Sequence, residues 1–563
     1  MSEAERGFAA AWWVVDDLVR FGMEHATLSP GSRSTPLALA LERHPNVRLH
    51  VHLDERAAAF FALGIAKATG RPVAVACTSG TAAAELLPAV VEASMSRATL
   101  VLLTADRPPE LRGVGANQAI DQVGLFGAYV RLSIDAPVPG DAPDEQTWHD
   151  LVLRLTRASM GWPPGPVHLN LPFREPLVGA PEVLPASAPS GTELTLSAAA
   201  EPEELEALER ELGSTTDGLI LAGSMRESPP TLPELAARAG WPLLAEPTSN
   251  LRVPGALSAG QFLLADARFS NEHVPEIVLQ FGAAPTSRAA LELVRRAGRL
   301  VIVDQDHVVA DPHRKAAWTL PAEPAGFVPE LLFGFEPGGE SAWLRAWREA
   351  DEAARRAVDR VVDAWTEPFE GRIARDVAAS VPDGGVLVVG SSMPVRDLDA
   401  HMRPRERLRV LANRGASGID GFLSTALGVS SAGVPTTALC GDLTLLHDIG
   451  SLIWSARRAY DCVIVVPNND GGAIFSFLPQ RELPEFEELF ATPHGLDLGA
   501  ICRAAGAAHA RVEHAAELLP AIERARGAGG VHVVEVPIDR ARNVELHDAV
   551  HEAVAAALEP PTM

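Results

Sequence analysis

The sequence predicts an α/β protein built from three doubly wound parallel-sheet domains. Short apolar runs rich in β-branched residues alternate with longer amphipathic stretches, which is the pattern of strands and helices in a parallel sheet. The alternation occurs in three parts of the chain, and segments rich in Pro, Gly, Ala and Ser separate them. A length of 563 residues is too great for one hydrophobic core and suits three domains of ordinary size.

The composition argues against several classes of partner. A net charge of −25 disfavours nucleic acid or an anionic membrane surface. The four cysteines are scattered and form no CxxC pair, so we expect neither a zinc site nor a disulfide framework. The N-terminus has acidic residues among its apolar ones, and no apolar run reaches membrane-spanning length. We therefore expect a cytoplasmic protein without nucleic-acid partners or membrane insertion.

The first predicted domain covers residues 1–180. We expect a helix near 10–21, a strand in VRLHVHL, a helix from DERAAAFF, the strand VAVAC, one helix over TSGTAAAELLPAVVEASM and the strand TLVLLTA. The carboxyl ends of parallel strands meet at one edge of a sheet, and ligands bind there. Three polar turns follow predicted strands of this domain.

The first polar turn is SPGSRS, which places Ser32 and Arg33 just before a helix. A guanidinium at such a turn can grip a carboxylate through two parallel hydrogen bonds. The simpler alternative is a helix-capping serine beside a solvated arginine.

The second polar turn is HLDERAAAF, where Glu55 begins a helix whose next residues are nearly all apolar. Its carboxylate is either a favourable partner of the helix dipole or a buried acid with a raised pKa. On the preceding strand, His50 and His52 share one face. A metal site would need a third ligand, so we favour a packed or half-exposed pair.

The third polar turn, LTADRPPELRGVGANQAIDQ, is long and contains Arg107, Arg112, Asn117 and Gln118. Its GVGANQ portion resembles half of a dinucleotide-binding fingerprint. The third glycine and the strand-to-helix placement are missing, so we discount a Rossmann site.

A linker and a second domain follow. Residues 177–202 are rich in Pro, Ala, Ser and Gly and predict the linker. The second domain, 200–335, has predicted strands in DGLILAGS, WPLLAEP, EIVLQFG and RLVIVDQD. Arg288 opens a helix predicted over 287–297, where a cation is unfavourable with the helix dipole. It is present either for an anion or as a loose surface residue.

A break at GFEPGGES, residues 334–341, precedes the third domain, 345–563. An amphipathic helix over 343–365 is predicted to be a solvated connector or a packing helix. None of the later GSS and GASG turns, nor the earlier TSG turn, completes a GxSxG elbow, which argues against a serine hydrolase.

Two polar turns of the third domain contain further candidate residues. GSSMPVRDLD contributes Ser392 and Arg396 directly after a predicted strand. NRGASGIDG contributes Arg414 and Ile419.

Two buried strands of this domain end in turns suited to a magnesium ion and a phosphate. TTALC leads to Asp442, and CVIVV leads to Asn469 and a glycine pair. Asn469 follows Asp442 by 27 positions, about the length of a crossover between parallel strands. A carboxylate and an amide oxygen from neighbouring strand ends suit Mg²⁺. A helix expected after the glycines would direct N–H groups at a phosphate.

These motifs resemble a known family. The GD…NNDGG pair is similar to the metal-diphosphate motif of thiamine diphosphate (ThDP) enzymes. Together with SPGSRSTPL, CTSGTAAAELLPAVVEA, ADRPPELRGVGANQAIDQ and NRGASGIDG, it resembles the 2-succinyl-5-enolpyruvyl-6-hydroxy-3-cyclohexene-1-carboxylate (SEPHCHC) synthases of menaquinone biosynthesis. The resemblance implies the ThDP-enzyme fold, with a pyrimidine-binding domain (1–180), a central domain (200–335) and a diphosphate-binding domain (345–563).

The resemblance also implies the reaction and the cofactor site. ThDP-dependent decarboxylation of 2-oxoglutarate would precede conjugate addition of a succinyl-semialdehyde carbanion equivalent to isochorismate. Glu55 would be the catalytic carboxylate on the aminopyrimidine ring, and Ile419 would wedge the cofactor into its bent shape. Asp442, Asn469 and the Gly471 carbonyl would bind Mg²⁺, with Mn²⁺ as the alternative ion. Further cofactor contacts would come from Leu443, Thr444, Gly472, Ala473 and Ile474.

Both implied substrates are dianions, and the implied substrate-binding set is correspondingly rich in arginine. It comprises Ser32, Arg33, Arg107, Asn117, Gln118, Arg288, Ser392, Arg396, Arg414, Ile474 and Phe475. Members of the family often have a Lys-Arg pair where this chain has Arg288 followed by Ala289, which is a departure. The site would lie between two subunits of a homodimer or of a dimer of dimers.

Two other functions compete with this hypothesis. Another ThDP-dependent 2-oxo acid decarboxylase or carboligase would need fewer arginines. A catalytically inactive ThDP-fold protein with a binding or regulatory role would be expected to lack Glu55, Asp442 or Asn469, and all three are present.

Overall fold

The structure is a computed structural model. Most of the predicted linker and residues 334–339 of the predicted break lie outside the part that it describes. That part comprises residues 1–141, 145–179, 184, 202–306, 310–333, 340–456 and 458–559.

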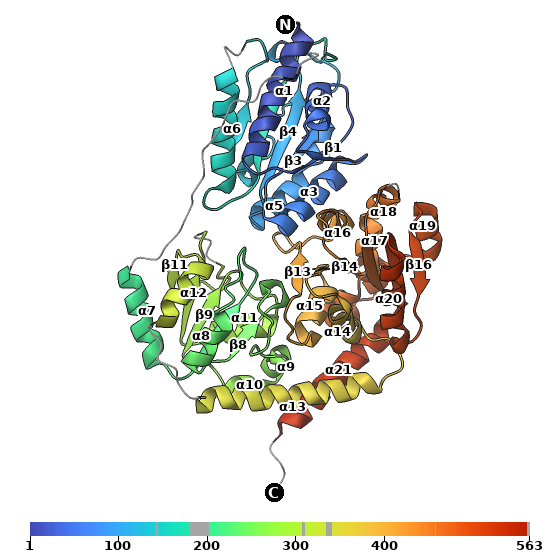
Figure 1. The fold of residues 1–563 in the computed structure, drawn as a ribbon. Coiled ribbons are helices and arrows are strands. Elements are labelled where there is room, and N and C mark those ends of the chain that lie inside the picture. The colour runs from blue at the N-terminus through green and yellow to red at the C-terminus, as the bar shows by residue number, and fades with distance from the viewer. Residues whose placement is uncertain are drawn as a thin grey trace. The chain divides into compact units, whose positions relative to one another are not determined.

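Three parallel sheets with helices between their strands make up the described residues (Figure 1), which confirms the predicted fold class. The first sheet has the strand order β2-β1-β3-β4-β6-β5. The third has the equivalent order, β13-β12-β14-β15-β17-β16, and the second has the order β11-β10-β9-β7-β8. In each sheet, the first strand in the chain lies between the second and the third, so the strand order reverses at that point, as it does in doubly wound sheets.

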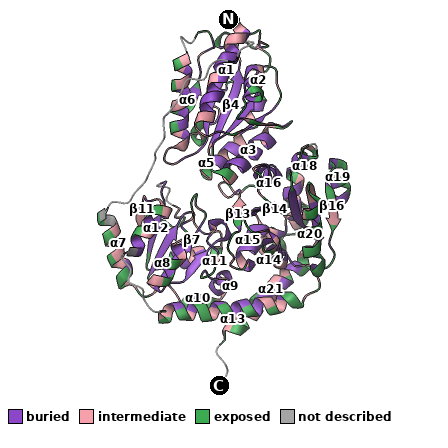
Figure 2. Cartoon of the chain, viewed as in Figure 1, coloured by how far each residue is buried: buried purple, intermediate pink, exposed green. Residues whose placement is uncertain are grey.

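The first sheet is built from residues 25–172. Its strands are β1 (His25–Leu28), β2 (Arg48–Val51), β3 (Val73–Cys77), β4 (Leu100–Asp106), β5 (Ser133–Asp135) and β6 (Val167–Pro172). Its helices are α1 (Glu3–Arg20), α2 (Thr35–Arg43), α3 (Glu55–Thr69), α4 (Thr81–Ala84), α5 (Leu87–Met95) and α6 (Glu145–Met160). Helices α1, α2 and α6 share one apolar core with the sheet, whereas α3 packs on α5 and on strands β1 and β3. Figure 2 shows the strands buried between these helices.

Two helix boundaries in this region differ from the prediction. Helix α1 begins at Glu3 rather than near residue 10, because Ser2 and Glu5 form a capping box at its N-terminus. The single helix predicted over TSGTAAAELLPAVVEASM is two helices, α4 and α5. Pro88 has no N–H group and its ring clashes with the carbonyl of Ala84, so the first helix ends there.

The second sheet covers residues 218–320. Its strands are β7 (Gly218–Ala222), β8 (Leu243–Ala245), β9 (Ile277–Phe281), β10 (Arg299–Val303) and β11 (Ala316–Leu320). Its helices are α7 (Pro202–Ser214), α8 (Leu232–Ala239), α9 (Gly260–Ala265), α10 (Ala267–Glu272), α11 (Arg288–Arg296) and α12 (Pro324–Phe333). Strands β7, β9 and β10 are apolar and almost fully buried, as central parallel strands must be.

The third sheet covers residues 386–537. Its strands are β12 (Val386–Val389), β13 (Arg409–Ala412), β14 (Thr436–Leu439), β15 (Cys462–Asn468), β16 (Ala508–Arg511) and β17 (Val531–Pro537). The helices of this part of the chain are α13 (Ala342–Ala364), α14 (Glu370–Ser380), α15 (Met393–His401), α16 (Phe422–Ser431), α17 (Asp442–His447), α18 (Ile449–Ser455), α19 (Leu498–Ala505), α20 (Leu518–Ala528) and α21 (Arg540–Leu558). Short helical turns include η4 (Ala473–Phe477), η5 (Pro479–Glu482) and the π-helical turn η6 (Glu487–Ala491).

Helix α13 is a packing helix, which decides between the two predicted alternatives. It begins after Ser341, whose hydroxyl accepts a hydrogen bond from the N–H of Leu344. Its apolar face packs along α21, and Trp347, Val358 and Leu546 belong to one buried cluster (Figure 1). No described helix combines the length and hydropathy that a membrane-spanning segment needs.

The chain folds into two compact units, each assembled from separate segments. The first unit comprises Met1–Leu196, Asn413–Val434 and Leu446–Asp461. The second unit comprises Ser197–Ala412, Pro435–Leu445 and Cys462–Met563. Helix α16 therefore belongs to the first unit, although it connects two strands of the third sheet in sequence.

Helices α3 and α16 cross at unusually short range within the first unit. A Cβ atom on Gly64 of α3 would lie 2.1 Å from the Thr425 carbonyl oxygen, and one on Gly428 of α16 would lie 2.1 Å from the Phe61 carbonyl oxygen. Only glycine fits at these two positions. The pair brings the backbones of the helix that begins with Glu55 and of α16 into contact.

Candidate functional site

Most of the predicted site residues lie in turns at the carboxyl ends of strands. They form two groups, one in each compact unit. In doubly wound sheets the ligand crevice lies where the strand order reverses, between the first and third strands of the unit. In the first sheet this point lies between β1 and β3, and in the third between β12 and β14. Polar turns of the predicted set follow β1, β12 and β14.

In the first group, Arg33 is buried and paired rather than solvated. Its guanidinium donates to the Phe173 carbonyl oxygen at 2.9 Å and to Glu175 Oε1 at 3.0 Å, whereas its Nε has no partner in the described part of the chain. The serine that precedes α2 is Ser34, and it makes no capping bond with its side chain. The simple alternative of a capping serine beside a solvated arginine is therefore wrong.

A second arginine lies beside the first. The Arg107 guanidinium bonds the hydroxyl of Ser79, which is fully buried at the end of β3. Burial and the neighbouring Arg33 charge lower the pKa of Arg107. Two guanidinium groups that repel each other in this way favour an anion between or beside them.

Gln118 completes this part of the group. Its side-chain Nε2 donates to the Ser79 backbone carbonyl oxygen at 2.9 Å, and the Gln118 backbone carbonyl oxygen accepts from the Ser79 hydroxyl at 3.0 Å. Gln118 has a φ of +54°, a backbone strain typical of functional sites. Ser32 and Asn117 are exposed nearby in sequence, whereas Arg112 is committed to Asp106 and Asp135 and forms part of the scaffold.

Glu55 is the first residue of α3 and is partly buried. Asp54 caps the helix by accepting from the N–H of Ala57 at 3.1 Å, which leaves the Glu55 side chain free of the capping role. Burial raises the pKa of Glu55, and the nearby carboxylates of Asp54 and Glu85 raise it further. Glu55 thus combines both predicted features, a first-turn position and a tendency to hold a proton.

The two histidines before Glu55 pack against an aromatic ring. His50 Nε2 lies 3.0 Å from His25 Nδ1, and both His50 and His52 pack against the Phe61 ring. Burial lowers the pKa of His50 to about 3 and that of His52 to about 4. The packed-pair interpretation is confirmed, and no cluster of three or more His, Cys, Asp or Glu ligands occurs among the described residues.

Two residues of the first unit come from the loop after β13. Arg414 and Ile419 are partly buried, and they lie on either side of a tight turn in which Ser417 has a φ of +63°. The loop ends at Gly421, the N-cap of α16.

In the second group, Ser392 and Arg396 follow β12. Ser392 has φ +74° and ψ −135°, a strained conformation for a residue with a side chain. Arg396 is exposed and donates to the Ser392 carbonyl oxygen at 2.7 Å.

Asp442 follows β14, whose register with β12 pairs Leu439 with Val389. The Asp442 carboxylate is 1% exposed and accepts from the N–H groups of Leu443 at 2.6 Å and Gly471 at 2.9 Å. Burial raises the pKa of Asp442, and these N–H donors oppose the shift. His494 Nε2 lies 3.4 Å from the same carboxylate, while its Nδ1 accepts from the Leu496 N–H at 3.0 Å.

Asn469 follows β15 and has one unsatisfied oxygen. Its Nδ2 donates to Glu370 Oε1 at 2.8 Å, whereas its buried Oδ1 has no partner in the described part of the chain. Leaving such an oxygen without a partner costs about 1–3 kcal/mol. The atom is therefore available to a ligand that is not part of the chain.

The glycine pair after Asn469 lets a second segment lie close to it. Gly471 has φ +136°, and a Cβ atom there would lie 2.1 Å from the Ala491 carbonyl oxygen, while the Gly472 N–H donates to that same oxygen at 2.7 Å. The helix expected after the glycines is only the short 3₁₀ turn η4, which is a correction. Pro479 disfavours a helical conformation at Leu478, so the turn ends at Phe477 and offers no helix terminus for a phosphate.

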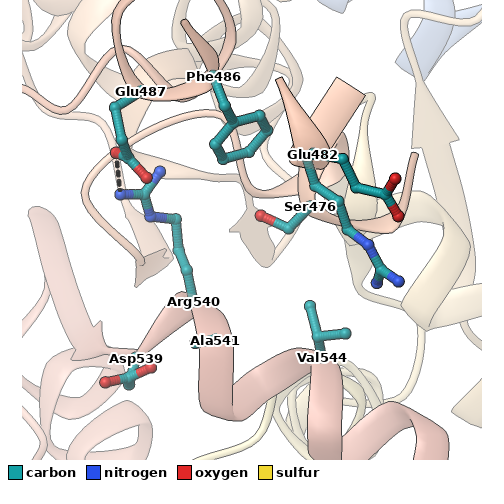
Figure 3. A pocket seen from close by; sticks show the side chains of 9 residues that line it. Ser476, Glu482, Phe486, Glu487, Asp539, Arg540, Ala541 and Val544 are labelled. Carbon is teal, nitrogen blue, oxygen red and sulfur yellow. Dashed lines mark hydrogen bonds and ion pairs between the residues drawn. The ribbon is translucent and has the colours of Figure 1, made fainter. Parts of the chain in front are cut away.

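Ile474 and Phe475 lie on η4 and are partly buried. The Phe475 ring packs on Phe490 of η6, with ring centroids 5.7 Å apart. A cavity of about 630 Å³ lies beside this segment, and none of the predicted residues lines it (Figure 3). Its lining residues are Ser476, Arg481, Glu482, Phe486, Glu487, Asp539, Arg540, Ala541 and Val544.

The remaining predicted residues lie elsewhere in the second unit. Leu443 and Thr444 form the first turn of α17, and Thr444 is buried. Arg288 is exposed at the start of α11, on the second sheet, where Ser287 caps the helix.

The residues around Asp442 fit a hard divalent cation. They offer a carboxylate, the free Oδ1 of Asn469 and the backbone carbonyl of Gly471, all oxygen donors of the kind that Mg²⁺ prefers. Burial raises the pKa of Asp442, and a bound cation would stabilise the charged form of its carboxylate.

Comparison with known proteins adds the decisive observation. The N-terminal TPP binding domain of thiamine pyrophosphate enzymes matches residues 9–125, and the C-terminal TPP binding domain matches residues 392–536. The chain is 45% identical to the 2-succinyl-5-enolpyruvyl-6-hydroxy-3-cyclohexene-1-carboxylate synthase of Thermobifida fusca, covering 98% of this chain and 99% of that protein. It is 41% identical to the synthase of Geobacillus kaustophilus, with 99% of both chains covered. It is 40% identical to that of Chloroflexus aurantiacus, with 97% and 96% covered.

The chain belongs to the SEPHCHC synthase family. Membership confirms the resemblance that the motifs predicted, and the two matched domains identify ThDP as the cofactor of the family fold.

Three residues near the SEPHCHC synthase motifs were not predicted from the sequence. Ser79 contacts both Arg107 and Gln118, and the TSG turn in which it lies was the available signal. His494 contacts Asp442, and the TPHG segment after η6 was its signal. Glu370 contacts Asn469 from α14, and no local pattern marks it.

Proposed function

We propose that the chain is a ThDP-dependent SEPHCHC synthase, which decarboxylates 2-oxoglutarate and joins the remaining four-carbon unit to isochorismate. The observation that carries this proposal is the similarity to named synthases over nearly the whole chain. The arginine-rich turns of both groups support it against another 2-oxo acid decarboxylase, since both substrates are dianions.

Asp442, Asn469 and the Gly471 carbonyl would hold Mg²⁺, or Mn²⁺ in its place. The unsatisfied Oδ1 of Asn469 supports this assignment, because a buried amide oxygen without a partner in the chain is open to a bound cation. His494 and Glu370 would keep the two side-chain ligands oriented.

ThDP, when bound, supplies the electron sink for decarboxylation and for carbon–carbon bond formation. Glu55 would hold a proton at the aminopyrimidine ring, and its raised pKa suits that role. Ile419 would support the bent shape of the cofactor. Backbone and side-chain contacts to the cofactor would come from Leu443, Thr444, Gly472, Ala473 and Ile474.

The substrate carboxylates would be held by the two groups of polar turns. The Arg33–Arg107 pair is a candidate anion site of the first unit, because an anion beside the two guanidinium groups would reduce their mutual repulsion. The full proposed set is Ser32, Arg33, Arg107, Asn117, Gln118, Arg288, Ser392, Arg396, Arg414, Ile474 and Phe475.

The proposed organisation has three domains, at residues 1–180, 200–335 and 345–563. We propose a cytoplasmic homodimer or dimer of dimers in which two subunits complete each site. Size-exclusion chromatography with light scattering, with and without ThDP and Mg²⁺, tests the oligomeric part of this proposal.

The activity is tested with purified protein, ThDP and Mg²⁺. We expect 2-oxoglutarate and isochorismate to disappear together in equal amounts, and Asp442→Ala to abolish both losses. Consumption of 2-oxoglutarate that does not depend on isochorismate would support another decarboxylase, and an absence of isochorismate loss would exclude the synthase.

A further inference from the structure

A buried ion pair holds the loop that carries Arg414 and Ile419. Glu92, on α5, is 3% exposed and accepts a hydrogen bond at 2.9 Å from Lys67 Nζ, on α3. The same carboxylate accepts from the backbone N–H of Gly415 at 3.0 Å and of Ala416 at 2.7 Å. All these residues belong to the first compact unit.

Lys67 holds the loop at a second point. Its Nζ also donates to Asn413 Oδ1 at 3.0 Å, and Asn413 Nδ2 donates to Thr425 Oγ1 at 2.9 Å. The loop is thus bonded to α3 and α16 through Asn413, and to α5 through Gly415 and Ala416. Its contacts begin at Asn413, one residue before Arg414.

Gly415 shows how close the loop lies to α5. A Cβ atom at this position would lie 2.7 Å from the Glu92 carbonyl oxygen and 2.8 Å from the Ser96 nitrogen. The NRGASG sequence therefore needs its first glycine for this approach. The approach also brings two consecutive N–H groups to one carboxylate, an arrangement that suits a negative charge.

We propose that Glu92 and Lys67 are positioning residues, which act through the loop to place Arg414 toward substrate and Ile419 toward the cofactor. The inference rests on the proposed function for the roles of those two loop residues. The hydrogen bonds of Glu92 to the loop do not depend on the proposed function. A buried pair of charges is costly to maintain for stability alone, because a well-packed apolar pair would often serve as well. Because the Glu92 carboxylate also accepts hydrogen bonds from two loop N–H groups, the pair has a task beyond packing.

The test compares Glu92→Gln with a matched control in the full-length protein. Glu92→Gln keeps the size of the side chain but presents an N–H group to one of the two loop donors. Asp17→Asn is the control, because Asp17 is a 2% exposed carboxylate in the same unit, paired with His149 and remote in sequence from the loop. Lys67→Met is the second variant, because it keeps the two hydrogen bonds from the loop to Glu92 but removes the one to Asn413. Lys67→Arg tests rescue by a conserved charge.

Hydrogen–deuterium exchange reads the loop directly, without activity. With ThDP and Mg²⁺ bound, peptides covering 413–421 should exchange about tenfold faster or more in Glu92→Gln, and at the wild-type rate in Asp17→Asn. We expect kcat to fall about 10- to 100-fold in Glu92→Gln, because small displacements of positioned groups have effects of that size. The Kd for ThDP, measured by tryptophan fluorescence, should change less than about threefold, because Asp442 and Asn469 are unaltered. Lys67→Met should lie between Glu92→Gln and wild type, and Lys67→Arg close to wild type.

Unchanged exchange at 413–421 in both Glu92→Gln and Lys67→Met would overturn the proposed attachment. Faster exchange with wild-type kcat and KM would overturn the positioning role, as would an equal loss of kcat in Asp17→Asn. Failure of the proposed function gives a different result, because the wild-type protein itself would then not consume isochorismate.

Discussion

The amide of Asn469 is fixed by Glu370, whose Oε1 accepts a 2.8 Å hydrogen bond from Nδ2. Both side chains are buried, and the bond leaves Oδ1 as the free atom of the amide. A carboxylate on α14 thereby determines which atom of Asn469 a cation would meet.

Glu370→Ala is expected to weaken Mg²⁺ binding about 10- to 100-fold, because the Asn469 amide then loses the contact that orients it. Titration of the ThDP-loaded protein with Mg²⁺, followed by tryptophan fluorescence, measures this change. Glu535→Ala is the matched control, since Glu535 makes the equivalent 2.8 Å bond to the neighbouring Asn468. Equal Mg²⁺ affinities in the two variants would contradict the assignment of Glu370.

Glu55→Gln is expected to reduce turnover by about 10²- to 10⁴-fold while the fold is retained, because the change removes only the exchangeable proton. Circular dichroism and thermal melting should match the wild type, and ThDP should still bind. Glu85→Gln is the control, because Glu85 is an exposed neighbour that acts on Glu55 only through its charge. Near-normal turnover in Glu55→Gln would mean that another group carries the proton.

Gly471→Ala is expected to lower both the Tm and the affinity for ThDP. The new methyl group would lie 2.1 Å from the Ala491 carbonyl oxygen, and a φ of +136° is unfavourable for alanine. Gly450→Ala, inside α18, has open space around the new methyl group and should be neutral or stabilising. Comparable Tm losses in the two variants would argue against the close contact between Gly471 and Ala491.

Acid is expected to destabilise the first unit through His50. Burial lowers the folded-state pKa of His50 from 6.5 to about 3, so only the unfolded chain takes up this proton between those values. Stability from this group is therefore complete above pH 6.5 and decreases as the pH falls toward 3. Thermal melts from pH 7.5 to 4.5 should show a steeper fall of Tm for the wild type than for His50→Gln. His313→Gln, at an exposed position, should leave the slope unchanged.

Much of the fold followed from the sequence, and the three edge strands that were missed share a cause. Strands β5, β11 and β16 were not predicted, and each lies at the edge of its sheet. Edge strands are partly exposed and need no continuous apolar run, so SID, AAWTL and AHAR give weak signals. Most of the central strands, which are buried on both faces, were apparent as apolar runs, but β1 and β6 were not singled out.

The site residues that were predicted from the sequence are those that belong to short local motifs. Asp442, Asn469 and Glu55 follow strands directly, so their position in the sequence indicates their position in the sheet. Glu370 and Glu92 were not predicted, because each acts on a residue far away in sequence. Such contacts arise from helix packing, and no local spacing encodes them.

The close crossing of α3 and α16 determines when the first unit can be completed during synthesis. The glycine surface of α3 is made among the first 70 residues, but its partner helix ends only at Ser431. A nascent chain must therefore wait for more than 350 further residues, and at about 5–20 residues per second this takes tens of seconds. During that interval the glycine surface of the helix that begins with Glu55 lacks the partner helix that covers it in the folded unit.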